Sequence, residues 1–117
     1  MPSTILIVDD HAGFRRAVRD MLEAEGFLVV AESATGGDAL TAAERVQPAV
    51  VLLDIGLPDI DGLEVAARLT AADGAPAVVL TSSRDAADFH TLVAPSGARG
   101  FIPKHELSGA AIAALSV

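Results

Sequence analysis

A continuous apolar run that ends in a single carboxylate constrains the fold of this chain more than any other feature. Residues 50–53 read Val-Val-Leu-Leu, and Asp54 follows them directly. Because no polar residue alternates along this run, it predicts a strand covered on both faces, as in a parallel sheet flanked by helices. Gly56, Pro58 and Gly62 then break the pattern. Asp54 is therefore expected at the mouth of a loop, at the carboxyl edge of the sheet.

Apolar and amphipathic segments alternate along the whole chain. Strands are expected at residues 4–8, 27–31, 50–53, 77–80 and 100–103, and helices at residues 12–25, 38–46, 62–72, 85–93 and 107–115. Apolar strands that alternate with amphipathic helices predict a doubly wound sheet of five parallel strands with helices on both faces. The predicted fold class is α/β, in one domain that spans residues 1–117.

Composition excludes several classes of function. Hydrophobic residues make up 51% of the chain, which argues against disorder, and the lack of cysteine excludes disulfides, thiolate chemistry and cysteine-based zinc sites. The formal net charge of -8 argues against direct binding of nucleic acid, which requires a basic surface. Since no charged-then-apolar leader or long apolar run is present, we expect no membrane association and a cytoplasmic location.

Polar side chains follow the ends of most of the predicted strands. They are Asp9 and Asp10 after the first strand, Asp54 after the third, Thr81 and Ser82 after the fourth, and Lys104, the only lysine of the chain, after the fifth. Because the carboxyl ends of parallel strands meet at one edge of a sheet, we expect these groups to share one crevice.

The three carboxylates of this crevice require a positive charge. At ~4 Å and an effective dielectric of about 20, each pair of carboxylates repels by ~4 kcal/mol, and a single lysine does not neutralise three acids. Oxygen ligands without cysteine favour Mg²⁺ over zinc or copper. A site with Mg²⁺, an ammonium group and a hydroxyl suits a phosphoryl group, with Asp54 as the nucleophile and the pair Asp9 and Asp10 on the metal. Taken alone, Asp54 could instead cap a helix or form a half-buried ion pair.

Several motifs coincide with these strand ends. They are Ile7-Val8-Asp9-Asp10-His11, Asp54 followed by Leu57-Pro58-Asp59-Ile60-Asp61-Gly62, Leu80-Thr81-Ser82, and Gly97-Ala98-Arg99-Gly100-Phe101-Ile102-Pro103-Lys104. In this order they resemble the receiver domain of two-component response regulators, the CheY-like family with a flavodoxin-like fold. The resemblance implies that Asp54 accepts a phosphoryl group from a phosphohistidine, in a Mg²⁺-dependent reaction. The implied partner is a sensor histidine kinase or a phosphotransfer protein, and the output partner is unknown. The implied role is that of a signalling phosphoacceptor and not of an enzyme.

The same resemblance implies a role for each matching residue. The implied metal ligands are Asp9, Asp10, Asp54 and the backbone carbonyl of Gly56. Lys104 would pair with the phosphoryl oxygens. Thr81, with Ser82 as the alternative, would move to hydrogen-bond the phosphoryl group, and Phe101 would turn inward behind it as an aromatic switch. Together they would alter a docking surface.

Two other functions are weighed against this one. A docking domain that keeps the fold without being phosphorylated is expected to have lost the acidic pair, Asp54 or Lys104, and none of them is lost. A phosphatase of the haloacid-dehalogenase type requires a second acid two residues after the nucleophile, where Gly56 stands. The start of the chain, with Phe14-Arg15 one turn after the acidic pair, is similar to NarL-like receivers joined to helix-turn-helix domains. We nevertheless expect a stand-alone receiver.

Three further polar residues near the crevice are assigned structural positions. His11 is expected to be a solvated loop residue. Asp59 and Asp61 are expected to stabilise a turn or to cap a helix, and not to bind the metal.

Overall fold

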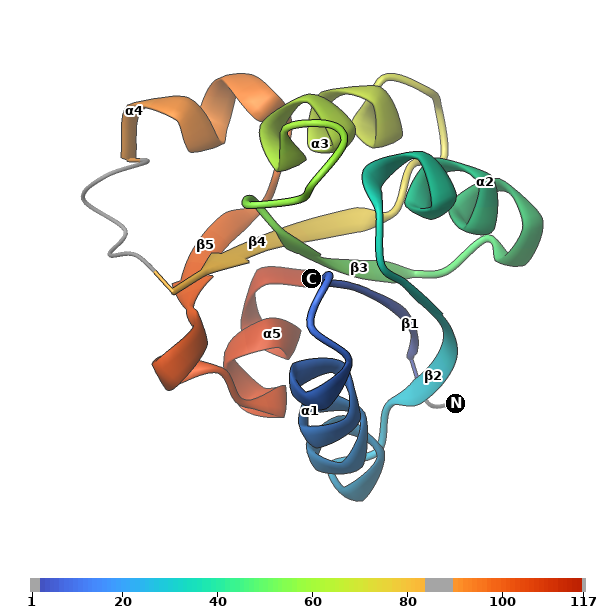
Figure 1. Ribbon diagram of the computed structural model, residues 1–117, viewed down its shortest axis with the longest axis vertical. Helices are drawn as coiled ribbons and strands as arrows, with labels where there is room; N and C mark the ends of the chain where they lie inside the picture. Colours follow the sequence, from blue (N-terminus) through green and yellow to red (C-terminus); the bar gives the residue numbers. More distant parts are fainter. Residues whose placement is uncertain (1–2, 84–89, 117) are drawn as a thin grey trace.

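Five parallel strands form one sheet in the order β2-β1-β3-β4-β5 (Figure 1). The strands are β1 (Thr4–Val8), β2 (Leu28–Ser33), β3 (Val50–Asp54), β4 (Ala77–Ser82) and β5 (Gly100–Pro103). This computed structural model describes residues 3–83 and 90–116. Each pair of neighbouring strands is parallel, so the predicted five-stranded parallel sheet is confirmed.

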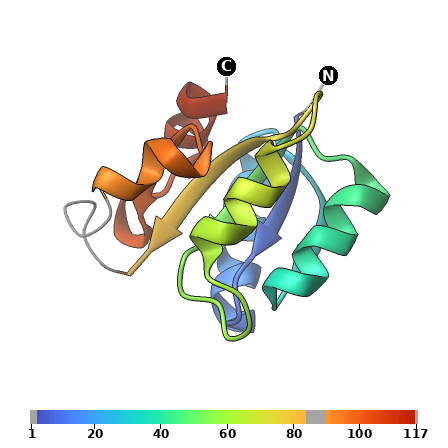
Figure 2. The ribbon, with the colours of Figure 1, turned by 90° about the horizontal axis from the view of Figure 1, so that it is seen from above.

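Helices cover both faces of the sheet (Figures 1 and 2). They are α1 (Ala12–Ala24), α2 (Gly36–Val46), α3 (Gly62–Thr70), α4 (His90–Val93) and α5 (Gly109–Ser116), with 3₁₀ turns at Ala94–Ser96 and Lys104–Glu106. Helices α1 and α5 lie on one face, and α2 and α3 lie on the other. The helix predicted at residues 85–93 falls largely outside the described residues. Among the helices that are described, none has the length and apolar character needed to cross a membrane.

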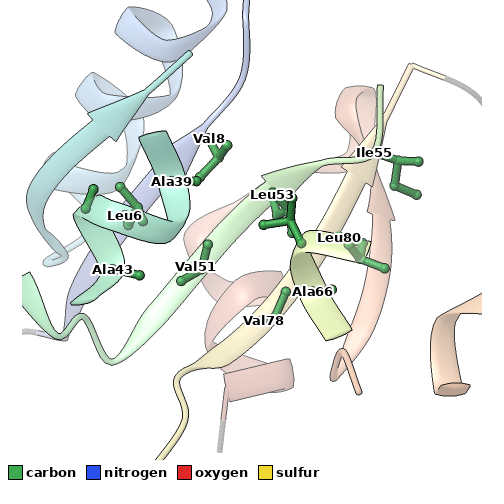
Figure 3. Close-up of a cluster of buried hydrophobic side chains, with 12 residues drawn as sticks. Leu6, Val8, Ala39, Ala43, Val51, Leu53, Ile55, Ala66, Val78 and Leu80 are labelled. Atoms are coloured by element: carbon green, nitrogen blue, oxygen red, sulfur yellow. The ribbon is translucent and has the colours of Figure 1, made fainter. Parts of the chain in front are cut away.

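Alternate residues of β1, β3 and β4 enter two separate apolar layers, because successive side chains of a strand point to opposite faces. Figure 3 shows one layer, in which Val51, Leu53, Val78 and Leu80 of the sheet meet Ala43 of α2 and Ala66 of α3. The other layer joins Ile5, Ile7, Leu52 and Val79 to Leu22 of α1 and Ile112 of α5. Strands β1, β3 and β4 are thus buried on both faces, as their unbroken apolar runs predict.

Local capping explains where two helices begin. Helix α2 begins at Gly36 and not at the predicted residue 38, because the side chain of Thr35 accepts a hydrogen bond from the backbone N–H of Asp38 at 3.1 Å. Helix α5 begins at Gly109 and not at residue 107, since the Ser108 hydroxyl accepts from the N–H of Ala111 at 3.0 Å.

Gly62 allows helix α3 to start directly against the end of β3. A side-chain carbon at this position would overlap the carbonyl oxygen of Asp54 and lie 2.6 Å from the Cα of Ile55. Both are backbone atoms, which cannot turn aside. The N–H of Gly62 also donates to the carbonyl of Ile55 at 3.0 Å. The close approach therefore fixes the loop that follows Asp54.

We predict that Gly62→Ala destabilises the domain by about 1–3 kcal/mol, because the added methyl group forces backbone atoms apart. The matched control is Gly13→Ala, since nothing lies within 4 Å of a side-chain carbon at Gly13 in helix α1. That change should stabilise by about 0.5 kcal/mol through the lower backbone entropy of alanine. Urea unfolding of both variants measures the two effects, and equal stability of the two would contradict the prediction.

Candidate functional site

The ammonium group of Lys104 lies between two carboxylates at the carboxyl edge of the sheet. Its Nζ atom is 2.6 Å from Oδ2 of Asp9 and 3.5 Å from Oδ2 of Asp54. Asp9 directly follows β1, Asp54 is the last residue of β3, and Lys104 directly follows β5. The order of the strands changes direction at β1, which lies between β2 and β3, and ligands bind at such a point in open α/β sheets. The fold thus brings together these three residues of the predicted crevice.

Asp9, Asp10 and His11 form a group that could hold a metal ion. Each offers one ligand atom, and these atoms all lie within 4.8 Å of one another. The side chain of His11 is 72% exposed, as expected for a solvated loop residue. Its Nδ1 atom nevertheless lies 3.2 Å from Asp9 and 3.0 Å from Asp10, a contact that the sequence did not predict.

The donor set of this group suits Mg²⁺. Asp9 is fully buried, and its Oδ2 atom faces Lys104 without a well-aligned hydrogen bond. A buried carboxylate oxygen in this state, beside the partly exposed carboxylate of Asp10, offers the hard oxygen ligands that Mg²⁺ prefers. The predicted metal roles of Asp54 and of the Gly56 carbonyl stay predictions.

Asp54 is a buried acid with few compensating contacts. Its side chain is 7% exposed, and Oδ1 accepts a hydrogen bond from the N–H of Gly56 at 3.2 Å. Burial raises the pKa of Asp54 above its ordinary value, and the negative charge of Asp9 adds to this effect. The Gly56 N–H and the Lys104 ammonium act in the opposite direction and only in part offset the rise in this pKa.

The two candidate hydroxyls at the end of β4 occupy different environments. Thr81 is buried, and its Oγ1 donates a hydrogen bond of 2.7 Å to the carbonyl of Ile102 in β5. Ser82 is the next residue, so its side chain points to the other face of the strand. It lines an open hollow of about 600 Å³ together with Asp54 and Lys104, and Thr81 does not contribute to that lining. Thr81 is the neighbour of Asp54 in the register of β3 and β4, whereas Ser82 lines the hollow, so the choice between the two hydroxyls stays a prediction.

Phe101 lies on β5 directly beside Leu80 in the register of the sheet. It is half-buried and packs against the apolar layer under α2 and α3. The inward turn expected of this ring stays a prediction.

The sequence model of the response regulator receiver domain matches residues 5–115. This chain belongs to the receiver domain family of response regulators. Receiver domains are signalling domains of two-component systems, and they generally bind Mg²⁺ at an acidic pocket and are phosphorylated by histidine kinases. The carboxylates of Asp9 and Asp10 form such an acidic group here. The predicted family is confirmed.

Known proteins similar to this receiver domain include several transcription regulators. A Pseudomonas aeruginosa protein described as a transcriptional regulator is 42% identical over 116 residues, which are 98% of this chain and 56% of that protein. BvgA of Bordetella pertussis, described as a positive transcription regulator of virulence factors, is 42% identical over 106 residues, 91% of this chain and 51% of its own. The receiver domain thus spans about half the length of the curated relatives it matches.

A solved structure supports the same assignment. The signal receiver domain of the response regulator NarL from Mycobacterium tuberculosis superposes with a TM-score of 0.87 at 29% identity. The match covers 97% of this chain and 96% of that domain, so it extends over the whole α/β architecture.

Asp59 caps a helix, as expected, although the helix is α2 and not the helix that follows it in the sequence. Asp59 accepts hydrogen bonds from the N–H groups of Gly36 at 2.8 Å and Gly37 at 2.9 Å, so it caps helix α2 from a distant loop. These backbone N–H groups lower the pKa of Asp59. Asp61 caps its own helix α3 through the N–H of Leu63, as expected.

The ring of Phe14 lies under Lys104, with 4.2 Å between the ring centroid and Nζ, a contact that the sequence did not predict.

We predict that Asp54→Asn raises the melting temperature of the metal-free domain at neutral pH by a few degrees. Because the pKa of Asp54 is raised on folding, the wild-type domain loses stability as the pH rises from about 3.8 through that raised pKa, whereas the asparagine variant has no such loss. Thermal unfolding across a pH series measures the difference.

The control for this experiment is Asp20→Asn, which changes an exposed carboxylate of α1. The stability of this control should follow that of the wild-type domain with pH. If Asp54→Asn is less stable than wild type at neutral pH, the ion pair with Lys104 outweighs the burial of the carboxylate.

Proposed function

We propose that this chain is the phosphoacceptor receiver of a histidine-to-aspartate phosphorelay, with Asp54 as the acceptor and one domain over residues 1–117. The observation that carries the proposal is the position of Lys104 between Asp9 and Asp54, at the edge where Asp10 and Ser82 also lie. Its donor would be a sensor histidine kinase or a phosphotransfer protein. Such kinases present their phosphohistidine in the cytoplasm, which is the location we propose.

The transfer makes one bond and breaks one. A carboxylate oxygen of Asp54 attacks phosphorus and forms an oxygen–phosphorus bond, which gives an acyl phosphate. The bond from phosphorus to the imidazole nitrogen of the donor breaks, and the imidazole leaves with the electron pair and takes up a proton. When bound, Mg²⁺ would supply positive charge against the phosphoryl oxygens. Asp9 and Asp10 would hold it.

The residues around Asp54 would orient its carboxylate and attract the negatively charged phosphoryl oxygens. The Gly56 N–H holds Oδ1 at 3.2 Å and so fixes the plane of the carboxylate. Lys104 is 19% exposed and lies 3.5 Å from Oδ2, close enough to turn from Asp9 toward a phosphoryl oxygen. Burial raises the free energy of the charged carboxylate, and converting it to the acyl phosphate moves the negative charge outward, toward the metal and the ammonium group.

The response of the domain would pass through the end of β4. Ser82 lines the hollow beside Asp54, so we assign it the hydroxyl that binds the phosphoryl group. Movement of this strand end would reach β5 through the hydrogen bond between Thr81 and Ile102, and from there Phe101. The surface formed by α4 and β5 is the proposed docking surface for the output protein.

We expect incubation with acetyl phosphate and Mg²⁺ to add one phosphoryl group to the wild-type domain and none to Asp54→Asn. Intact mass measures the addition, and amide NMR should show shifts in β4, β5 and α4. Omission of Mg²⁺ should slow the reaction by at least about tenfold, since the carboxylate repulsion is then uncompensated. Metal binding without incorporation of phosphate would instead favour a docking domain that works without phosphorylation.

A pair of substitutions separates the two hydroxyls. Ser82→Ala removes a hydrogen bond to a charged group, worth ~1.5–3 kcal/mol, so in the phosphorylated variant the equilibrium constant for the shifted state should fall by about 10-fold to 150-fold. Thr81→Val keeps the shape of the side chain and loses only the bond to Ile102. It should lower the free energy of unfolding by about 1–3 kcal/mol and leave the NMR response in place.

The opposite result would assign the hydroxyl that binds the phosphoryl group to Thr81. In that case Thr81→Val would abolish the shifts in β5 and α4, and Ser82→Ala would retain them.

A further inference from the structure

We propose that Phe14 is a positioning residue for Lys104, whose ring forms one wall of a seat that keeps the ammonium group within reach of Asp54. The inference rests on the proposed function, because it gives Phe14 control over the cation that meets the phosphoryl group. The seat itself is defined in the unphosphorylated domain by Phe14 of α1, Asp9 after β1 and Asp54 of β3.

The distances show that the ring and the carboxylates contact the same ammonium group. Nζ of Lys104 lies 4.2 Å from the centroid of Phe14, 2.6 Å from Oδ2 of Asp9 and 3.5 Å from Oδ2 of Asp54. An ammonium group within about 6 Å of a ring centroid is attracted by the electrons of the ring face, more strongly where water is excluded. With 19% of its side chain exposed, Lys104 is in a partly desolvated position where this attraction counts.

The ammonium group of Lys104 must be restricted in position without being fully neutralised by a carboxylate. Its four-carbon stem has many rotamers, and the residue lies at the start of a 3₁₀ turn at the edge of the hollow. A carboxylate partner alone would fix the ammonium group and neutralise it. The ring of Phe14 has no formal charge, so it restricts the position of Lys104 and leaves the positive charge available to a phosphoryl oxygen.

The ring also stays in place when the carboxylates change partners. Phe14 is half-buried and packs against the apolar layer beneath α1 and α5, so its position does not depend on the acids. Helix α1 begins at Ala12, directly after the acidic loop, which places Phe14 in the first turn beside Asp9 and Asp10. If Mg²⁺ engages Asp9, the ammonium group loses its nearest carboxylate, and the ring still holds it near Asp54.

The chain offers a direct spectroscopic test, because Lys104 is its only lysine. Lysine labelled with ¹³C gives one ε-methylene signal. In the wild-type domain the face of Phe14 should shift these protons upfield. Phe14→Leu should move the signal to the position of a free lysine side chain, and Phe14→Tyr should retain the wild-type position, since tyrosine also binds cations through its ring.

The matched control is Phe27→Leu. Phe27 packs against the same apolar layer and directly precedes β2, so it lies at the amino edge of the parallel sheet, opposite to the edge that carries Lys104. The change removes the same ring from the same layer and should leave the methylene signal of Lys104 where it is.

A kinetic readout separates positioning from general loss of structure. With acetyl phosphate, we expect Phe14→Leu to lower the rate of phosphorylation about threefold to tenfold and Phe14→Tyr to restore it. The Mg²⁺ concentration for half-maximal rate should not change, because Phe14 contributes no ligand. A structural disturbance would also alter this Mg²⁺ dependence.

The proposal is overturned if Phe14→Leu leaves the methylene signal unshifted, or if Phe27→Leu lowers the rate as much as Phe14→Leu does. If the wild-type domain takes up no phosphoryl group at all, the proposed function fails. The methylene signal then still decides whether Phe14 holds the lysine.

Discussion

The mutual repulsion of carboxylates at one sheet edge is the constraint on which the rest of this structure depends. Asp9 and Asp54 are buried at the ends of β1 and β3, where water screens their charges poorly, and the ammonium group of Lys104 contacts both. The free energy that offsets this repulsion in the folded state comes chiefly from burial of the two apolar layers that enclose β1, β3 and β4. The apolar strands hold the carboxylates close together despite their mutual repulsion, and this arrangement favours the binding of a cation at the site.

The main features of the fold and site follow from local pattern. Unbroken apolar runs specify buried parallel strands, and parallel strands place their following residues at one edge. This argument brings Asp9, Asp54 and Lys104 together although 95 positions of chain separate the first from the last. It works because strand direction and strand order leave the residues after each strand little freedom in where they lie.

Other features depend on tertiary contacts and cannot be predicted in this way. The choice between Thr81 and Ser82 depends on register, because a shift of one residue moves a side chain to the opposite face of β4. The seat of Lys104 on Phe14 depends on how α1 packs, and an apolar position on a helix does not show what lies above it. A capping role could be predicted for both Asp59 and Asp61, but only the structure shows that Asp59 caps the distant helix α2 while Asp61 caps its own helix.

The loop after Asp54 is fixed at two points, by Asp59 to the start of α2 and by Gly62 against the backbone of β3. A segment anchored in this way has a length that is set by its anchors, so an inserted or deleted residue would pull one of them apart. The number of residues between 54 and 62 is therefore a geometric requirement of this fold, set by the distance between the two anchors and not by the sequence of the loop itself.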